Sequence, residues 1–379
     1  MDAGVRRLKL VLSVDALAPQ LTGIGRYTWE LAQRLPLHSE VTGVRFFRSG
    51  QWVDDPQQLL LAPATRVKPK VPKWLKPPRW ALGWSMAQAC RNKVFHGPNF
   101  FIPPCADRGV ITIHDLSVFK FPQTHPAARI RQFERDFSDS VARCAHVITD
   151  SQTTRDEVMA YTGLAANRVT AVPLGVSAAY RPLTHAELAA PLRHYGLMPG
   201  AYGLCVSTLE PRKKIEQLLM AWQQLPAAVR SACPLMLAGS KGWLSDGLQT
   251  KISQGTAQGW LRYLGYVPEA DLPLLYAGAA VFVYPSTYEG FGLPPIEAMA
   301  CGVPVVVSNT SCLPEVTQGA ALTVDPDDLL AFTIALEKSI HDHVWRSCAV
   351  TKGRQVAASY TWQACVDKTI EVYQRAAPV

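Results

Sequence analysis

The segment from Val281 to Gly302, VFVYPSTYEGFGLPPIEAMACG, holds the pattern that decides the fold. It opens with a short apolar run, as a strand buried on both faces would. A loop with two glycines follows, and a helical pattern then runs from Pro295 to Cys301. Proline suits this place because the first helical turn does not need its amide hydrogen. A buried strand, a glycine loop and a helix form the repeating unit of a mostly parallel α/β sheet.

The same alternation extends over the whole chain of 379 residues, which is more than one ordinary domain needs. It restarts after Tyr180-Arg181-Pro182, so we expect an interdomain linker at roughly residues 177–200. The sequence predicts an α/β protein with two Rossmann-like domains, residues 1–180 and 181–355, facing across a cleft, and a C-terminal helix in residues 356–379 that packs back on the first domain. The expected strands are Leu8–Val14, Val110–His114, His146–Asp150, Val169–Val172, Tyr202–Ser207, Leu235–Ala238, Leu261–Gly265, Val281–Tyr284 and Val303–Val307.

Composition narrows the class of protein. The net charge of +8 favours an acidic partner, which leaves a nucleotide, a phospholipid surface and nucleic acid open. Nine cysteines are scattered without the spacing of a zinc site, as in a reduced, cytoplasmic protein without a structural metal. No apolar run reaches the length of about 18 residues that a transmembrane helix needs.

Two glutamates, Glu289 and Glu297, stand at the loop and in the helix of the opening segment, with seven residues between them. A carboxylate is a poor phosphate ligand but a good acceptor for sugar hydroxyls. Gly290 and Gly292 permit a close approach of the backbone to a ligand. The alternative, solvated glutamates in an ordinary turn, would suffice for the pair alone. The surrounding glycines, prolines and strands favour a sugar site.

A basic pair, Arg212 and Lys213, follows the first strand of the second half, within TLEPRKK. Cations at a helix start oppose the helix dipole, and an anionic ligand such as a diphosphate would explain them. A solvated basic helix start is the alternative.

The first half offers weaker candidates. Gly23 and Gly25 stand in a turn after the first strand and permit close approach to a phosphate or an acceptor, although a plain turn competes with this interpretation. His114 ends a strand, where its ring can meet a sugar hydroxyl or only cap the strand. His96 and Asn99 are candidates for the acceptor side, with a simple turn as the alternative.

The segment Glu289 to Glu297 resembles the Glu-x7-Glu motif of the family 4 retaining glycosyltransferases, which have the GT-B fold. The resemblance implies that Glu289 contacts the donor sugar and Glu297 the ribose, and that His114 lies near the donor sugar. The Glu-Pro-Arg-Lys sequence looks like that of mannosyl- and rhamnosyltransferases of surface polysaccharides, although Thr208 stands where many members have the arginine. By the same resemblance, the amides of Phe291, Gly292 and Leu293 approach the sugar and diphosphate. The resemblance also implies that Gly265, Tyr266 and Val267 hold the nucleobase, with a plain core strand as the alternative.

The implied reaction transfers a hexose from a nucleotide-diphosphate sugar, with GDP-mannose or GDP-rhamnose favoured, to a polyprenyl-diphosphate-linked glycan such as O-antigen. The resemblance implies retention of configuration. No metal-ligand cluster is visible in the sequence, so we expect a reaction without a metal ion or a cofactor. A sugar-nucleotide epimerase, another enzyme of the same fold, or a non-catalytic binder of sugar nucleotides remains an alternative. The motifs argue against a nucleic-acid partner.

The segment Arg66 to Lys93 combines basic residues with tryptophans and prolines. This composition suits an anionic membrane surface, and a solvated basic loop fits it equally. The first interpretation would place the protein peripherally on the inner face of the cytoplasmic membrane. The residues concerned are Lys68, Lys70, Lys73, Lys76 and Arg79 with Trp74, Trp80 and Trp84.

Overall fold

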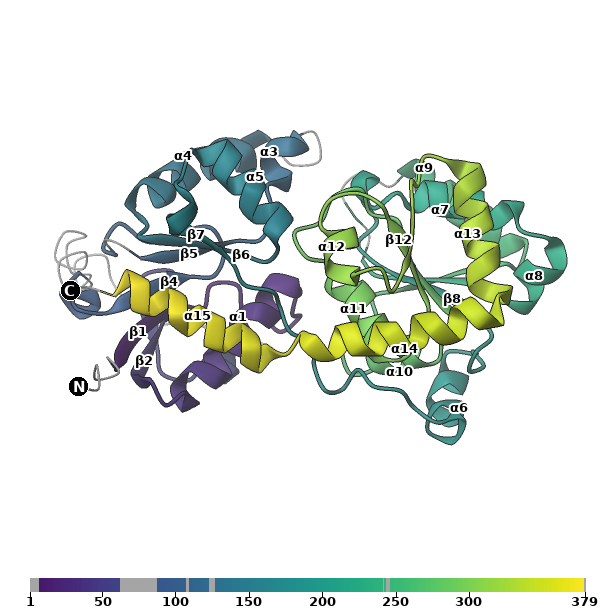
Figure 1. Cartoon of the computed structure of the whole chain (residues 1–379), viewed down its shortest axis with the longest axis horizontal. Helices are drawn as coiled ribbons and strands as arrows, with labels where there is room; N and C mark the ends of the chain where they lie inside the picture. The colour runs from purple at the N-terminus through teal and green to yellow at the C-terminus, as the bar shows by residue number, and fades with distance from the viewer. Residues whose placement is uncertain are drawn as a thin grey trace, which may run out of the picture. The chain divides into compact units, whose positions relative to one another are not determined.

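The computed structural model describes residues 7–61, 87–106, 109–122, 127–240, 242 and 246–377. The chain forms two compact units (Figure 1). Unit 1 contains Met1–Leu116, Ala128–Leu174 and Trp362–Val379, and unit 2 contains Ser117–Ala127 and Gly175–Thr361. The basic segment Arg66 to Lys93 lies outside the described residues except for its last part.

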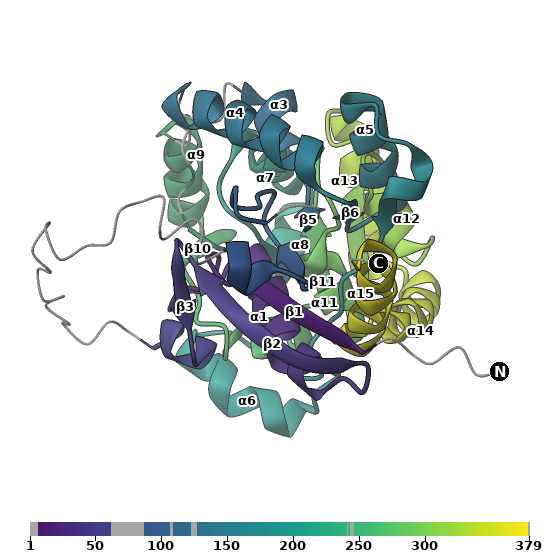
Figure 2. The same ribbon diagram turned by 90° about the vertical axis from the view of Figure 1, so that its left-hand side faces the viewer.

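Unit 1 is built on a seven-stranded sheet with the order β3-β2-β1-β4-β5-β6-β7. All neighbouring strands are parallel except β2 and β3, which form an antiparallel pair at one edge (Figure 2). The strands are β1 (Leu8–Ser13), β2 (Val41–Arg48), β3 (Gln51–Val53), β4 (Val94–Gly97), β5 (Val110–Ile113), β6 (His146–Thr149) and β7 (Val169–Ala171).

The helices of unit 1 come from both ends of the chain. α1 (Gly23–Arg34) begins at Thr22, whose hydroxyl accepts a hydrogen bond from the Gly25 amide. The last helix, α15 (Trp362–Ala376), packs against α1 and against β6 (Figure 1), with Trp362 and Tyr373 buried. The remaining long helices are α4 (Ala127–Arg143) and α5 (Gln152–Thr162).

Unit 2 is built on a fully parallel six-stranded sheet with the order β10-β9-β8-β11-β12-β13. Its strands are β8 (Gly203–Val206), β9 (Leu235–Ala238), β10 (Leu261–Gly265), β11 (Val281–Tyr284), β12 (Val305–Ser308) and β13 (Leu322–Val324).

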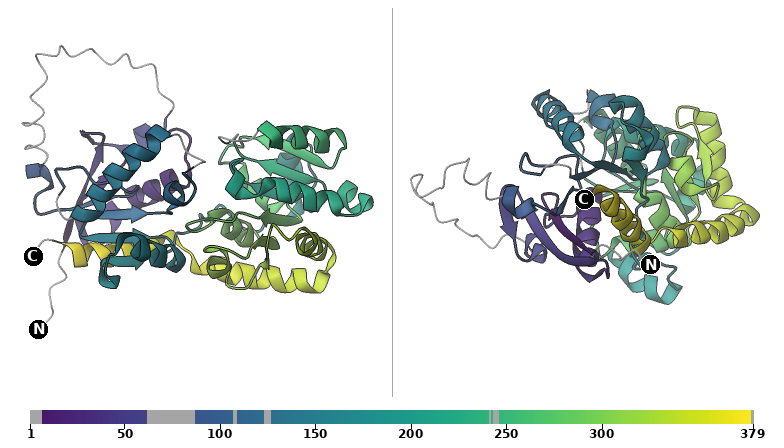
Figure 3. Two further views of the ribbon diagram at one scale, coloured as in Figure 1. Left: turned by 90° about the horizontal axis from the view of Figure 1, so that it is seen from above. Right: turned by 60° about the vertical axis from the view of Figure 1, so that its left-hand side comes forward.

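Helices cover both faces of this sheet. On one face lie α7 (Ile215–Gln224), α9 (Asp246–Ala257) and α13 (Leu329–His341); on the other lie α10 (Leu272–Ala277), α11 (Leu293–Ala300) and α14 (His343–Ser359) (Figure 1). The yellow helix α14 lies on the outside of unit 2 (Figure 3).

One buried contact explains a glycine within β8. Trp222 of α7 is fully buried, and a Cβ atom at Gly203 would lie 2.2 Å from its ring. Only glycine therefore lets α7 pack this closely on the sheet.

Each sheet reverses its strand order once. In unit 2 the chain builds outward from β8 to one side and then continues with β11 on the other side; in unit 1 the corresponding neighbours are β1 and β4. Ligands of parallel α/β sheets bind beyond the carboxyl ends of the strands at such a switch point, where adjacent loops diverge. A ligand is therefore expected at the loops after β8 and β11 in unit 2, and at those after β1 and β4 in unit 1.

The structure adds elements to those expected. β2, β3 and β13 had no predicted counterpart, and the expected linker at 177–200 contains the helix α6 (His185–His194). α6 starts with a capping box, in which Thr184 and Glu187 bond each other's backbone amides.

Candidate functional site

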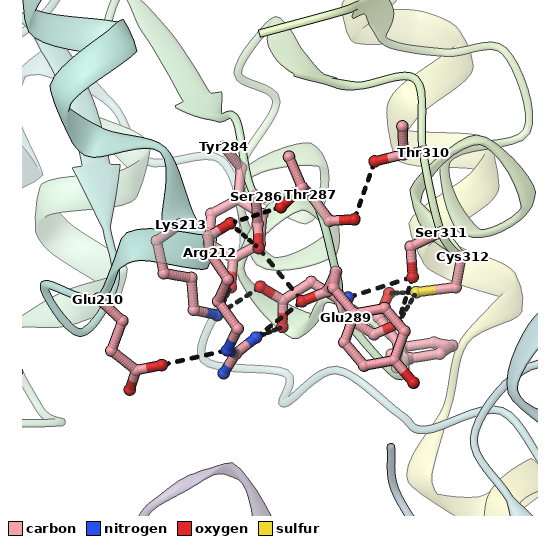
Figure 4. Close-up of polar contacts among 12 residues, drawn as sticks. Glu210, Arg212, Lys213, Tyr284, Ser286, Thr287, Glu289, Thr310, Ser311 and Cys312 are labelled. Carbon is pink, nitrogen blue, oxygen red and sulfur yellow. Dashed lines mark hydrogen bonds and ion pairs between the residues drawn. The ribbon is translucent and has the colours of Figure 1, made fainter. Parts of the chain in front are cut away.

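The loops after β8 and β11 bring three charged side chains together at the switch point of unit 2. Arg212 and Lys213 lie in a short 3-10 turn, Pro211–Lys213, and Glu289 lies in the loop that leads to α11. Figure 4 shows all three side chains pointing toward one another. The sequence predicted each of them as a site residue.

Lys213 is the most enclosed member of this cluster. Its ammonium group donates hydrogen bonds to Glu289 Oε1 and, over 2.8 Å, to the Tyr284 hydroxyl. Arg212 lies further out, with Nη1 3.4 Å from Glu289 Oε2. The guanidinium also donates to the Tyr288 carbonyl oxygen over 2.7 Å and to Glu210 Oε2 over 3.1 Å. Arg212 is thus held by three oxygen atoms in a fixed orientation.

Electrostatics keep Glu289 ionised. Burial alone would raise the pKa of this carboxyl group, but the charges of Lys213 and Arg212 outweigh burial and hold the pKa at about 2. Burial lowers the pKa of Lys213, and Glu289 opposes that effect. Together with Glu210, the two cations face two carboxylates, so the cluster is close to neutral on its own. Any anion that binds here competes with Glu289 for the cations.

A second turn braces the backbone at Glu289. The Glu289 amide donates to Ser311 Oγ over 3.2 Å, and the Ser311 hydroxyl donates to the Glu289 carbonyl oxygen over 2.7 Å. The Cys312 thiol lies 3.2 Å from the carbonyl oxygens of both Glu289 and Phe291. Sequence reasoning missed Ser311, Cys312 and Tyr284. Their position at or just after the ends of β11 and β12 was the available signal.

Gly292 begins α11 with a left-handed backbone, φ +92°, and a Cβ atom there would lie 2.8 Å from Leu313 Cδ2. The left-handed backbone angle is the feature that favours glycine here. Phe291 is buried against the ring of Tyr360, and Leu293 is half-buried as the first helical residue. A ligand at this turn would therefore meet backbone groups rather than side chains.

Glu297 lies one helical turn into α11 and is 5% exposed. Burial and then the charge of Glu297 raise the pKa of Tyr276 on the neighbouring α10. At the end of β10, Gly265 has φ +68°, Tyr266 is 53% exposed and Val267 is buried. The exposed ring of Tyr266 can stack on a flat ligand.

In unit 1, both ring nitrogens of His114 have partners. Nδ1 lies 2.7 Å from Asp150 Oδ2, and Nε2 lies 2.8 Å from the Pro98 carbonyl oxygen. A hydrogen bond from the ring to a sugar hydroxyl, as predicted, requires one of these bonds to break. His96 is 1% exposed; its ring nitrogens lie 2.6 Å from the Tyr373 hydroxyl and 2.8 Å from that of Thr112. Burial and the charge of His114 lower the pKa of His96 to about 3, so this ring is neutral.

A cavity of about 140 Å³ lies at the switch point of unit 1, between the ends of β1 and β4. The Asp15 carboxylate accepts hydrogen bonds from Ser13 and Ser49, each over 2.6 Å. Next to it, a Cβ atom on Gly25 would lie 3.1 Å from the Ala16 carbonyl oxygen, whereas Gly23 faces open space. The lining residues are Ser13, Asp15, Ala16, Gly97, Pro98, Asn99 and Phe101.

Metal-ligand clusters and membrane-spanning helices are both absent from the part of the chain that the structure describes. Within the ranges described above, no three His, Cys, Asp or Glu side chains gather as metal ligands would. Among the same residues, no helix combines the length and apolarity needed to cross a membrane.

Comparison with known proteins shows the family. Residues 21–180 match the family model described as Glycosyltransferase Family 4, and residues 200–355 match that described as Glycosyl transferases group 1. The chain is 38% identical over 382 residues to the O-antigen chain mannosyltransferase B of Escherichia coli. The aligned region covers 97% of this chain and 100% of the relative.

Two solved structures show the same fold. WaaG, a glycosyltransferase involved in lipopolysaccharide biosynthesis, superposes with a TM-score of 0.71 at 13% identity over 96% of this chain and 99% of its own. HepE of Anabaena, in complex with UDP and glucose, gives a TM-score of 0.71 at 14% identity over 97% of this chain and 100% of its own. Two α/β units, each built on a mostly parallel sheet and similar to these structures, make up the GT-B fold. This chain belongs to the family 4 glycosyltransferases.

Proposed function

We propose that this glycosyltransferase transfers mannose, with retention of configuration, from GDP-mannose to a polyprenyl-diphosphate-linked glycan of the O-antigen type. The observation that carries the proposal is Glu289, kept ionised between Lys213 and Arg212 at the switch point of unit 2. The relative that shares 38% of its sequence is an O-antigen mannosyltransferase, which favours mannose over rhamnose.

In this proposal the donor lies over the loops after β8 and β11. Glu289 accepts hydrogen bonds from the sugar hydroxyls, since an ionised carboxylate is a strong acceptor. Arg212 and Lys213 stabilise the diphosphate, together with the amides of Phe291, Gly292 and Leu293 at the start of α11. The nucleobase of the donor lies at Gly265, Tyr266 and Val267. The phosphates or the acceptor lie close to the backbone at Gly23 and Gly25.

Glu297 is assigned to the ribose, and we expect Glu297→Gln to weaken nucleoside binding about tenfold, because it loses a charged hydrogen bond. The buried position of this carboxylate motivates the assignment. Calorimetry with guanosine, GMP and GDP is the measurement. Equal affinities of wild type and variant for guanosine would reject the role.

The positive charge of Arg212 and Lys213 can balance the leaving diphosphate, so we propose a reaction without a metal ion. The leaving phosphate would itself take the proton of the acceptor hydroxyl on the same face of the sugar. Transfer should therefore persist undiminished in excess EDTA. Loss of transfer in EDTA with recovery on adding Mg²⁺ or Mn²⁺ would show that a metal balances the charge instead.

We place the acceptor sugar in the cavity of unit 1, lined by Asp15 and Asn99. Carboxylate and amide groups suit sugar hydroxyls, whereas a carboxylate repels the acceptor's diphosphate. The cavity would thus hold a sugar ring and leave the diphosphate outside. His96, on the strand that leads into the cavity wall, would support it from the core.

A donor panel tests the proposed function. Release of GDP, UDP or dTDP is measured from the corresponding sugar nucleotides, with and without a synthetic mannosyl acceptor on a short polyprenyl diphosphate. We expect GDP release from GDP-mannose, increased by the acceptor, and an α-linked product by NMR. Donor turnover to an epimer without transfer would replace the proposal with an epimerase.

An anionic membrane surface is the proposed second partner, on the composition of Arg66 to Lys93. Each basic residue near such a surface adds about 1 kcal/mol. Replacing Lys70, Lys73 and Lys76 by glutamate should therefore release the protein from phosphatidylglycerol vesicles while donor hydrolysis stays unchanged. Identical sedimentation of both proteins with the vesicles would leave the segment as a solvated loop.

A further inference from the structure

The hydrogen bonds of His114 fix where its protons are. Nε2 lies 2.8 Å from the Pro98 carbonyl oxygen. A carbonyl oxygen can only accept, so Nε2 carries a hydrogen atom. Nδ1 lies 2.7 Å from Asp150 Oδ2, and a further proton must lie between these two atoms, because facing lone pairs would repel at that distance.

The pair therefore shares one proton. On nitrogen it makes an imidazolium beside a carboxylate, and on oxygen it makes a neutral imidazole beside a carboxylic acid. In both forms Nε2 keeps its hydrogen and donates to Pro98. Asp150 thus determines which tautomer of His114 faces the Pro98 loop.

Burial makes this proton hard to remove. His114 is 8% exposed and Asp150 is 3% exposed, and Asp150 Oδ1 has no hydrogen-bond partner among the described residues. Burial lowers the pKa of His114, but Asp150 and the Pro98 carbonyl outweigh it and raise the pKa above its ordinary value. Burial also raises the pKa of Asp150, which His114 only partly offsets. Loss of the proton would leave an unshared negative charge inside unit 1.

Pro98 belongs to a tight loop that forms one wall of the unit 1 cavity. A Cβ atom on Gly97 would lie 1.9 Å from the Phe101 carbonyl oxygen, and Phe100 has a left-handed backbone with φ +65°. These two constraints leave the loop few alternative conformations. A bond to the Pro98 carbonyl therefore sets the position of Asn99 beside it.

We propose that Asp150 is a positioning residue for the acceptor: through the proton that it shares with His114, it fixes the Pro98 carbonyl and the cavity wall that carries Asn99. The inference rests on the proposed function, since it takes this cavity as the acceptor subsite. His114 then acts through the loop rather than by a ring contact to the sugar.

Removing the shared proton should release the loop. The remaining hydrogen moves to Nδ1, because the carboxylate is the stronger acceptor. A bare Nε2 then faces the Pro98 oxygen and repels it. The KM for the acceptor should therefore rise at alkaline pH, as the pair deprotonates. The other titratable groups around the pair are Asp115 after β5, Tyr27 of α1, His96 of β4 and Cys365 of α15.

Two variants separate the shared proton from the hydrogen bond itself. In Asp150→Asn the amide can donate to Nδ1, so Nε2 keeps its hydrogen at every pH. Its acceptor KM should stay near that of the wild type at neutral pH and lose the alkaline rise. Asp150→Ala removes the partner of Nδ1 and should raise the acceptor KM about tenfold at all pH values, the equivalent of one hydrogen bond. Asp156→Asn, on the exposed side of α5, is the matched control.

The measurement is transfer from GDP-mannose to the synthetic mannosyl acceptor from neutral to alkaline pH, with GDP-mannose hydrolysis recorded for each protein. Hydrolysis should be unchanged, because in this inference Asp150 acts on the acceptor alone, and Glu289, Arg212 and Lys213, which are assigned to the donor sugar and its diphosphate, belong to unit 2. An alkaline rise that persists in Asp150→Asn overturns the inference, whether or not Asp150→Ala folds. So does a wild-type acceptor KM in folded Asp150→Ala. Absence of transfer by the wild type would overturn the proposed function and this inference with it.

Discussion

Glu289→Gln should lower kcat about ten- to a hundred-fold while leaving the affinity for GDP at least as high as in the wild type. The loss reflects one charged hydrogen bond to the donor sugar, worth roughly 1.5–3 kcal/mol. The retained affinity follows from the cluster itself, in which Glu289 neutralises Lys213 and Arg212. Removing the carboxylate charge frees both cations for the diphosphate.

Steady-state kinetics and calorimetry with GDP measure the two effects separately. Glu216→Gln is the control, because Glu216 pairs with Lys251 on the exposed surface of unit 2. A parallel loss of turnover and GDP affinity would mean that Glu289 only holds the loop together. Unchanged turnover would remove Glu289 from the reaction.

Lys213→Met should weaken GDP binding about ten- to a hundred-fold and leave guanosine binding unchanged, because only the diphosphate meets the ammonium group. It should also lower the free energy of unfolding by about 3 kcal/mol, since it breaks a buried ion pair. Lys213 and Glu289 side chains are 8% and 11% exposed, so solvent screens their interaction little.

The same substitution should change the pH dependence. In the wild type the pKa of Glu289 is depressed to about 2, so its contribution to stability is complete above the pKa of the unfolded chain and is lost as pH falls toward 2. Without Lys213 the pKa rises, and both stability and turnover should fall at a higher pH. Lys251→Met, which breaks the exposed pair, serves as control in chemical unfolding and in calorimetry. Equal losses of GDP and guanosine affinity would contradict the assignment to the diphosphate.

Much of the fold could be predicted from the sequence, because its central strands are short apolar runs that the local sequence pattern alone identifies. β11 and β9, for example, are buried along their whole length and coincide with the predicted Val281–Tyr284 and Leu235–Ala238. β2 escaped prediction because only two of its eight residues are buried, so its pattern has no continuous apolar run. Helix α6 was not predicted because prolines at 182 and 191 obscure the helical pattern of its sequence.

The candidate site could be predicted in position but not in its contacts. Loops after strands were the expected place for Glu289 and Lys213, and parallel topology explains why. That the Lys213 ammonium group binds Glu289, 76 residues away, depends on the register of β8 and β11, which no local pattern encodes. For the same reason, the sequence could not show that both nitrogens of His114 have partners in unit 1.

The path of the chain has a consequence for the order in which the protein is made. Unit 1 takes its first strand from the start of the chain and its helix α15 from the end, whereas the main part of unit 2 is one continuous segment, Gly175–Thr361. A ribosome therefore finishes unit 2 before it has synthesised the helix that buries Trp362 and Tyr373 in unit 1. The N-terminal unit is the last to have all of its core residues available.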